Sequence, residues 1–159
     1  MEFTARNVFD CDVPTAFAML TDPAFLEQVA QVSNPTDFTI TASPALTRTE
    51  RTLTSAPPAS AFTGAEVGII DEIIWNEPEA GEYRGTASVA LVDLPLSLTG
   101  DVRLFPEGST SVLEYSGELS VDIPVVGKKL EKIAAPLLLK GIEYQQLIAD
   151  DWLAPKASG

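Results

Sequence analysis

The chain has 159 residues, which is enough for one domain with a sizeable core and too few for two domains of ordinary size. Its ten basic residues stand against 23 acidic ones, and the net charge of −13 disfavours binding to the phosphate backbone of nucleic acids. The single cysteine, Cys11, excludes an internal disulfide. The sequence shows neither a leader-like N-terminus nor an apolar run long enough to span a membrane. We therefore expect one cytoplasmic domain, residues 1–159, without stable membrane insertion.

Residues 2–11 alternate between the two faces of a strand, as a half-buried strand does. Asp12 and Asp22 each precede a segment with a proline near its start and apolar residues at helical spacing. An aspartate can accept hydrogen bonds from the free N–H groups at a helix start, and proline is tolerated in the first turn. Two short helices are therefore predicted after these residues.

From Asp37 onward the hydrophobic period is two, and turn residues interrupt the chain at short intervals, as in an antiparallel meander. Six further strands are predicted, at residues 37–43, 46–54, 67–76, 82–92, 95–105 and 110–122. Gly85, Gly100 and Gly117 lie inside three successive strands, where glycine permits a sharp coiling of the sheet. The longest irregular segment, residues 55–64, is the best candidate for a mobile flap.

Residues 124–153 predict one long amphipathic helix. Its apolar stripe, at steps of three and four, consists of Leu130, Ala134, Leu137, Gly141, Tyr144, Ile148 and Trp152. The opposite face carries Lys129, Lys132, Pro136, Lys140, Glu143, Gln146 and Asp150. A helix of this kind needs a curved apolar sheet to lie on, and we expect a ligand-sized gap between the two.

The order of one strand, two short helices, six strands and a long C-terminal helix resembles the helix-grip fold. The superfamily with this fold includes START lipid-transfer domains, the birch-pollen allergen family and polyketide cyclases. The junction Asp122-Ile-Pro-Val-Val-Gly-Lys-Lys-Leu-Glu131, followed by the helix and Trp152-Leu153, is similar to an uncharacterised actinobacterial branch, a domain of unknown function. The resemblance implies an α+β fold with a seven-stranded curved antiparallel sheet, two short helices and a long C-terminal helix that encloses a hydrophobic cavity. It does not imply one chemistry, because such folds include binders and enzymes.

The absence of histidine removes the commonest general base and transition-metal ligand, and it excludes a Ser-His or Cys-His nucleophile. The thiol of Cys11 lies between Asp10 and Asp12, whose charges oppose thiolate formation. The acids of the chain lack the spacing of a calcium loop. No catalytic residue, metal site or cofactor is therefore predicted.

Asp71 is an acid within an apolar strand. If the apolar residues of strand 67–76 point inward, Asp71 points inward with them, and its raised pKa would suit an acid, a base or a ligand anchor. The opposite register, or an ion pair with an arginine on a neighbouring strand, is the favoured alternative. Arg48 and Arg51 pose the same question, because each is either part of a cross-strand pair or reaches into the cavity toward a ligand carboxylate or phosphate.

The preferred function is binding or carriage of a hydrophobic small molecule, such as a lipid, a polyketide or an isoprenoid. Two alternatives stay open: a cyclase or dehydratase that uses Asp71 or Tyr115, and a protein-interaction module whose own side chains fill the cavity. The candidate wall residues are Asp71, Trp75, Tyr83, Leu98, Leu113, Tyr115, Leu119, Leu137, Gly141 and Tyr144, with Phe25 and Phe62 near a mouth.

Residues 128–140 hold four lysines and one acid, a local balance of +3 that leaves −16 for the rest of the chain. Lys128, Lys129 and Lys132 lie in the first turns of the predicted helix, where the helix dipole disfavours cations. A solvated surface cluster accounts for them. The alternative is a landing site for an anionic head group or partner.

Overall fold

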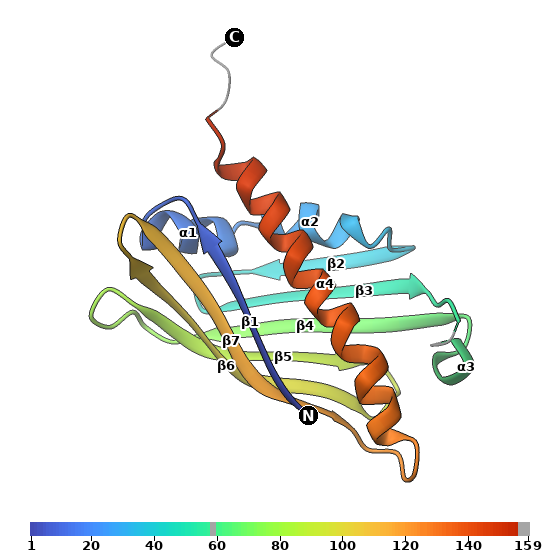
Figure 1. The fold of residues 1–159 in the computed structure, drawn as a ribbon. Coiled ribbons are helices and arrows are strands. Elements are labelled where there is room, and N and C mark those ends of the chain that lie inside the picture. Colours follow the sequence, from blue (N-terminus) through green and yellow to red (C-terminus); the bar gives the residue numbers. More distant parts are fainter. Residues whose placement is uncertain (58–59, 156–159) are drawn as a thin grey trace.

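The computed structural model describes residues 1–57 and 60–155, with the side chain of Phe62 outside the description. Its elements are β1 (Glu2–Phe9), α1 (Val13–Leu20), α2 (Pro23–Val32), β2 (Asp37–Ala42), β3 (Leu46–Thr54), α3 (Ser60–Thr63), β4 (Glu66–Trp75), β5 (Tyr83–Leu91), β6 (Leu96–Glu107), β7 (Thr110–Val121) and α4 (Gly127–Leu153). The strands form one antiparallel sheet in the order β1-β7-β6-β5-β4-β3-β2. The sheet curves around α4, which crosses it diagonally (Figure 1). The predicted fold class is confirmed.

The two short helices begin where the sequence predicts. Asp12 accepts a hydrogen bond from the backbone N–H of Thr15 at 3.0 Å, and Asp22 accepts one from the N–H of Ala24 at 2.8 Å. Each cap satisfies a donor that the helix itself leaves free, which contributes about 1 kcal/mol to stability. The strand β1 ends at Phe9, two residues before the predicted Cys11, and α1 begins at Val13 after the cap Asp12.

Glycines allow the sheet to curl. Gly100 of β6 lies directly opposite Gly117 of β7. A Cβ at Gly100 would collide with the carbonyl oxygen of Ser116, and one at Gly117 would come within 2.5 Å of the carbonyl oxygen of Thr99. The neighbouring backbones occupy the volume that any side chain needs, so the strands can coil sharply at this pair.

The tightly packed core fills one end of the sheet, beneath α1, α2 and the last turns of α4. Phe17 of α1 stacks on Tyr83 with ring centroids 3.7 Å apart and meets Trp75 edge to face. Phe25 of α2 packs edge to face against Trp152 of α4, with centroids 5.6 Å apart. These aromatic contacts close one end of the fold and leave the other end of the sheet to the first half of α4.

Candidate functional site

The inner face of the sheet is apolar and incompletely covered. The cross-strand register places the alternate residues of β4, β5 and β6 on the face that also carries the core. Apolar side chains of this face that are only partly buried include Val67, Ile69, Ile73, Val89, Leu91 and Leu98. An apolar wall that is accessible on the inside of a fold is the usual lining of a small-molecule site.

The position of α4 explains this exposure. The Gln145 amide donates to Asn7 Oδ1 at 2.8 Å and to the Tyr115 hydroxyl at 3.2 Å, and Asn7 Nδ2 donates to the carbonyl of Ile142 at 3.1 Å. Asn7 and Tyr115 belong to β1 and β7, so these contacts hold the helix over one edge of the sheet. The main sheet contacts of α4 among the described residues are with these two strands and not with β4, β5 or β6.

Gln146 holds the edge of the sheet. Its amide accepts from the backbone N–H of Val8 at 2.9 Å and donates to the carbonyl of Val8 at 2.6 Å, as a neighbouring strand would. The sequence analysis placed Gln146 on the face of the helix opposite the apolar stripe, and the structure turns that side of α4 toward the edge of β1. The physical reason is that β1 is an edge strand with unpaired backbone groups, which attract a polar side chain.

The helix is consequently rotated from the predicted orientation. Leu137 and Tyr144, which the sequence analysis placed on the buried stripe, are 63% and 40% exposed, and a Cβ built at Gly141 meets no atom within 4 Å. Gln146 turns one flank of α4 toward the outer edge of β1. Leu137, Gly141 and Tyr144 lie on the opposite flank of the helix. Contact of these three candidates with a ligand, across from the candidate Leu98 of β6, stays a prediction.

An ion pair lies on the same inner face. The guanidinium of Arg51 in β3 donates to Asp71 Oδ2 in β4 at 2.9 Å and to the Ser33 hydroxyl at 3.0 Å. This bond confirms the favoured interpretation, a pair with an arginine on a neighbouring strand. Asp71 also points inward with Ile69 and Ile73, as the alternative required. By contrast, Arg48 faces outward and pairs with Glu50 and Glu72.

Burial and the charge of Arg51 have opposite effects on the pKa of Asp71. Desolvation raises the pKa of the Asp71 carboxyl above the ordinary aspartate value, although Arg51 acts in the opposite direction. The Arg51 Nε–H is buried without an acceptor in the described residues, and 39% of the Asp71 side chain stays accessible. The inner face therefore offers one polar point, with a donor and an acceptor, within an apolar surface.

Replacing Arg51 with methionine is expected to lower the free energy of unfolding by about 1–2 kcal/mol at neutral pH, less than for a fully buried pair because both side chains keep some contact with solvent. Without the guanidinium, the folded-state pKa of Asp71 rises further above its unfolded value. The protonated form of Asp71 is then favoured in the folded protein. The loss in free energy of unfolding is therefore small below the unfolded-state pKa of Asp71 and grows as pH rises through its folded-state pKa. Urea unfolding at acidic and neutral pH measures this loss. A double variant that adds Asp71→Asn should lose the pH dependence, and a deficit independent of pH in Arg51→Met itself would contradict this account.

Tyr115 is a hydrogen-bonded phenol and not a free base. Its hydroxyl accepts from Gln145, and burial raises its pKa to about 12, with the charge of Asp71 acting in the same direction. At neutral pH it is protonated. Sequence reasoning missed its partner Gln145 and the second acceptor of that amide, Asn7, although a polar residue at an inward position of β1 was a signal for them.

The remaining candidates divide by burial. Phe25, Leu113 and Leu119 are fully buried, and Trp75 is 4% exposed, so in this structure they are packed core residues and do not border free space. Phe25 in particular lies in the core and not at an opening. Tyr83 is covered by Phe17. Phe62 lies in α3, and its side chain is outside the described residues. Ligand contact by these residues stays a prediction.

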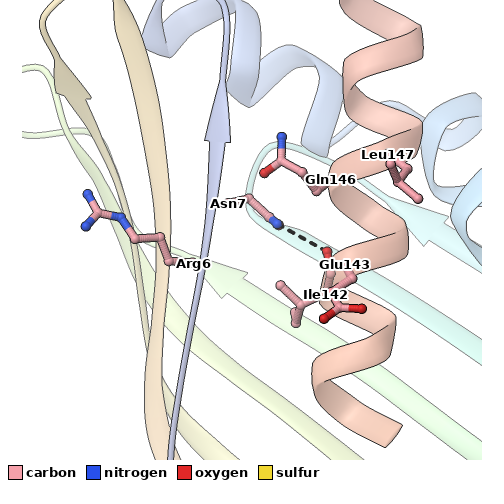
Figure 2. A pocket seen from close by; sticks show the side chains of 6 residues that line it. All are labelled: Arg6, Asn7, Ile142, Glu143, Gln146 and Leu147. Atoms are coloured by element: carbon pink, nitrogen blue, oxygen red, sulfur yellow. Dashed lines mark hydrogen bonds between the residues drawn. The ribbon is translucent and has the colours of Figure 1, made fainter. Parts of the chain in front are cut away.

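Two surface hollows lie at the margins of this face. One, of about 370 Å³, runs between β1 and α4, and Figure 2 shows Asn7 reaching from β1 toward the helix while Arg6 points away from it. The other, of about 250 Å³, lies over β2, β3 and β4 beside Gly68 and Val92.

Within residues 1–57 and 60–155 no cluster of three or more potential metal ligands is present. None of the helices described in these ranges is long and apolar enough to cross a membrane.

Residues 4–153 match the model of the family described as "Protein of unknown function (DUF2505)". The chain belongs to this family. No curated protein matches the sequence of this DUF2505 chain. The narrower assignment to an actinobacterial branch stays a prediction.

Solved structures with the same fold include two START-type proteins and one enzyme. The STAR-related lipid transfer protein from Xanthomonas axonopodis is 13% identical with a TM-score of 0.62, over 96% of this chain and 85% of that chain. A START superfamily protein from Mycobacterium smegmatis is 14% identical with a TM-score of 0.59, over 96% and 99%. Norcoclaurine synthase from Thalictrum flavum, in complex with dopamine and hydroxybenzaldehyde, is 14% identical with a TM-score of 0.58, over 98% and 89%. At such identities the likeness shows the fold alone, and it confirms the helix-grip architecture.

Proposed function

We propose that this DUF2505 protein binds or carries a hydrophobic small molecule, of the lipid, polyketide or isoprenoid type, between the inner face of the sheet and α4. The observation that carries the proposal is the partly exposed apolar wall of β4, β5 and β6, which includes Leu98. Leaving such surface exposed to water costs about 25 cal/mol per Å², and an apolar ligand would recover that free energy. The similar START-type structures are in keeping with this proposal.

The ion pair of Arg51 and Asp71 would fix the orientation of the bound ligand. An amphipathic ligand would place its apolar body along Leu98 and Val89 and its polar end at Arg51 and Asp71. The guanidinium supplies donors and the free carboxylate oxygen an acceptor, so a hydroxyl or carbonyl group suits the pair better than a second charge. The ligand therefore needs few polar atoms.

A tryptophan at Gly141 is expected to abolish ligand binding while the protein stays folded. A Cβ at this position meets no atom within 4 Å, so an indole there would enter the space that the proposal assigns to the ligand without displacing core atoms. Gly141→Ala is the matched control, because it removes the same helix-interior glycine without filling the space. Native mass spectrometry on protein from its own source should find an adduct with wild type and Gly141→Ala, released on denaturation, and none with Gly141→Trp. An adduct of equal abundance on Gly141→Trp would contradict the proposed site.

A cyclase-type or dehydratase-type enzyme is the second candidate, and the raised pKa of the inward-facing Asp71 favours it. The enzyme norcoclaurine synthase has the same fold. The released ligand separates the two functions: a carrier returns the same mass from wild type and from Asp71→Asn, whereas an enzyme returns a product from the first and unconverted substrate from the second. A bare chain in every variant would favour the third alternative, a core filled by its own side chains.

A further inference from the structure

The positive charges of this protein divide into two classes. Every arginine of the chain forms an ion pair with an acidic side chain: Arg6, Arg48, Arg51, Arg84 and Arg103. None of the four lysines in the described residues does, and all four, Lys128, Lys129, Lys132 and Lys140, lie exposed on the first half of α4. In a protein with a net charge of −13, the cations without an acidic partner in residues 1–57 and 60–155 are therefore gathered on one segment.

An apolar side chain projects beside these lysines. Val125, in the turn between β7 and α4, is fully exposed, and its φ of 73° lies in the left-handed region that a β-branched residue rarely adopts. The turn lies at the opposite end of α4 from the C-terminus (Figure 1). Such a backbone conformation is costly and persists where the surroundings impose it, often at functional positions. Here it directs a valine into solvent immediately before Lys128 and Lys129.

We propose that the turn 122–127 and the adjoining Lys128, Lys129 and Lys132 dock this end of the protein on an anionic lipid surface, with Val125 entering the head-group layer. Lysines near an anionic bilayer each contribute about a fivefold gain in partition, and their mobile point charges suit lipid head groups. Glu131 offsets one of the four lysines and accepts a hydrogen bond from the backbone N–H of Val121, so residues 128–140 keep a net charge of +3. The docking is peripheral and involves no spanning segment.

The shape of the surface favours a bilayer over a protein. A stable protein partner needs a packed patch of roughly 800 Å² on each side, whereas a bilayer accepts one projecting apolar side chain surrounded by cations. The remaining charge of the chain, −16 outside residues 128–140, is repelled by an anionic surface and turns the lysine end toward it.

Vesicle co-sedimentation tests the proposal, with phosphatidylcholine vesicles that contain or lack phosphatidylglycerol. We expect binding only to the phosphatidylglycerol vesicles, and we expect added salt to weaken it because the charges are exposed. The variant K128Q/K129Q/K132Q should lose roughly a hundredfold in partition. The matched control R6Q/R48Q/R84Q changes the net charge equally at exposed or partly exposed arginines elsewhere and should bind as wild type does.

Val125→Gly separates docking from folding. Glycine adopts a positive φ freely, so the melting temperature should be unchanged or higher, while vesicle binding falls by roughly tenfold because the apolar contact is lost. Absence of binding to phosphatidylglycerol vesicles, equal binding by the lysine variant, or equal loss in the arginine control would overturn the proposal. Lysine-dependent binding to polyglutamate, without binding to the vesicles, would overturn it in favour of an acidic protein partner.

Discussion

Replacing Phe25 with alanine is expected to lower the free energy of unfolding by about 3–5 kcal/mol, the range for deleting a buried aromatic side chain. The ring is fully buried, and it packs edge to face against Trp152, with ring centroids 5.6 Å apart. This contact ties α2 to the last turns of α4. The lost ring leaves a cavity that neighbours from two separate helices cannot easily close.

Urea unfolding measures the loss, and Phe38→Ala is the matched control. Phe38 lies on the edge strand β2 and is only partly buried, so the same deletion there should cost clearly less. A double-mutant cycle with Trp152→Ala should give a coupling energy of about 0.5–1.5 kcal/mol for the aromatic pair. A loss at Phe25 no greater than at Phe38 would indicate that Phe25 borders an opening, as the sequence analysis supposed.

Gly100→Ala is expected to destabilise the fold by about 1–3 kcal/mol or to prevent folding, because the added methyl group would collide with the backbone of β7 at Ser116 and Gly117. A side chain in the way could change its rotamer, whereas a paired backbone can yield only by separating the strands. The curl of the sheet at the Gly100 and Gly117 pair would then be lost, and with it the concave wall opposite α4.

The same substitution at Gly141 should have the opposite sign. That position lies inside α4 with open space around it, so alanine is expected to stabilise the protein by roughly 0.5–1 kcal/mol through helix propensity alone. Thermal and urea unfolding of Gly100→Ala and Gly141→Ala, each compared with wild type, measures the two changes in stability. Destabilisation of similar size at both positions would mean that the loss at Gly100 does not arise from the backbone contact.

Together these variants distinguish the two ends of the fold. The end closed by α1, α2 and Trp152 is packed with aromatic rings, and substitutions there act on stability. The part of the inner face around Val89 and Leu98 has partly exposed apolar side chains, and substitutions there are expected to act on binding. Ligand sites commonly occupy such less well packed regions of an otherwise rigid scaffold.

The sequence by itself determined the elements and their order. The caps at Asp12 and Asp22, the period of two in the strands and the amphipathic pattern of the last helix depend on residues within a few positions of one another. The strand boundaries consequently agree to within one or two residues. The main difference is the start of α4, where Val125 takes up a left-handed turn and delays the helix to Gly127.

Only the tertiary structure decided how α4 is rotated and which charges face inward. The rotation depends on Asn7 and on the unpaired backbone of Val8, more than 130 residues before Gln145 and Gln146. The inward position of Asp71 depends on the register of β3 and β4, which places Arg51 within reach. A hydrophobic pattern specifies that one side of an element is buried, but its partners across the fold determine which side chains at the border of that face are covered and which stay accessible to a ligand.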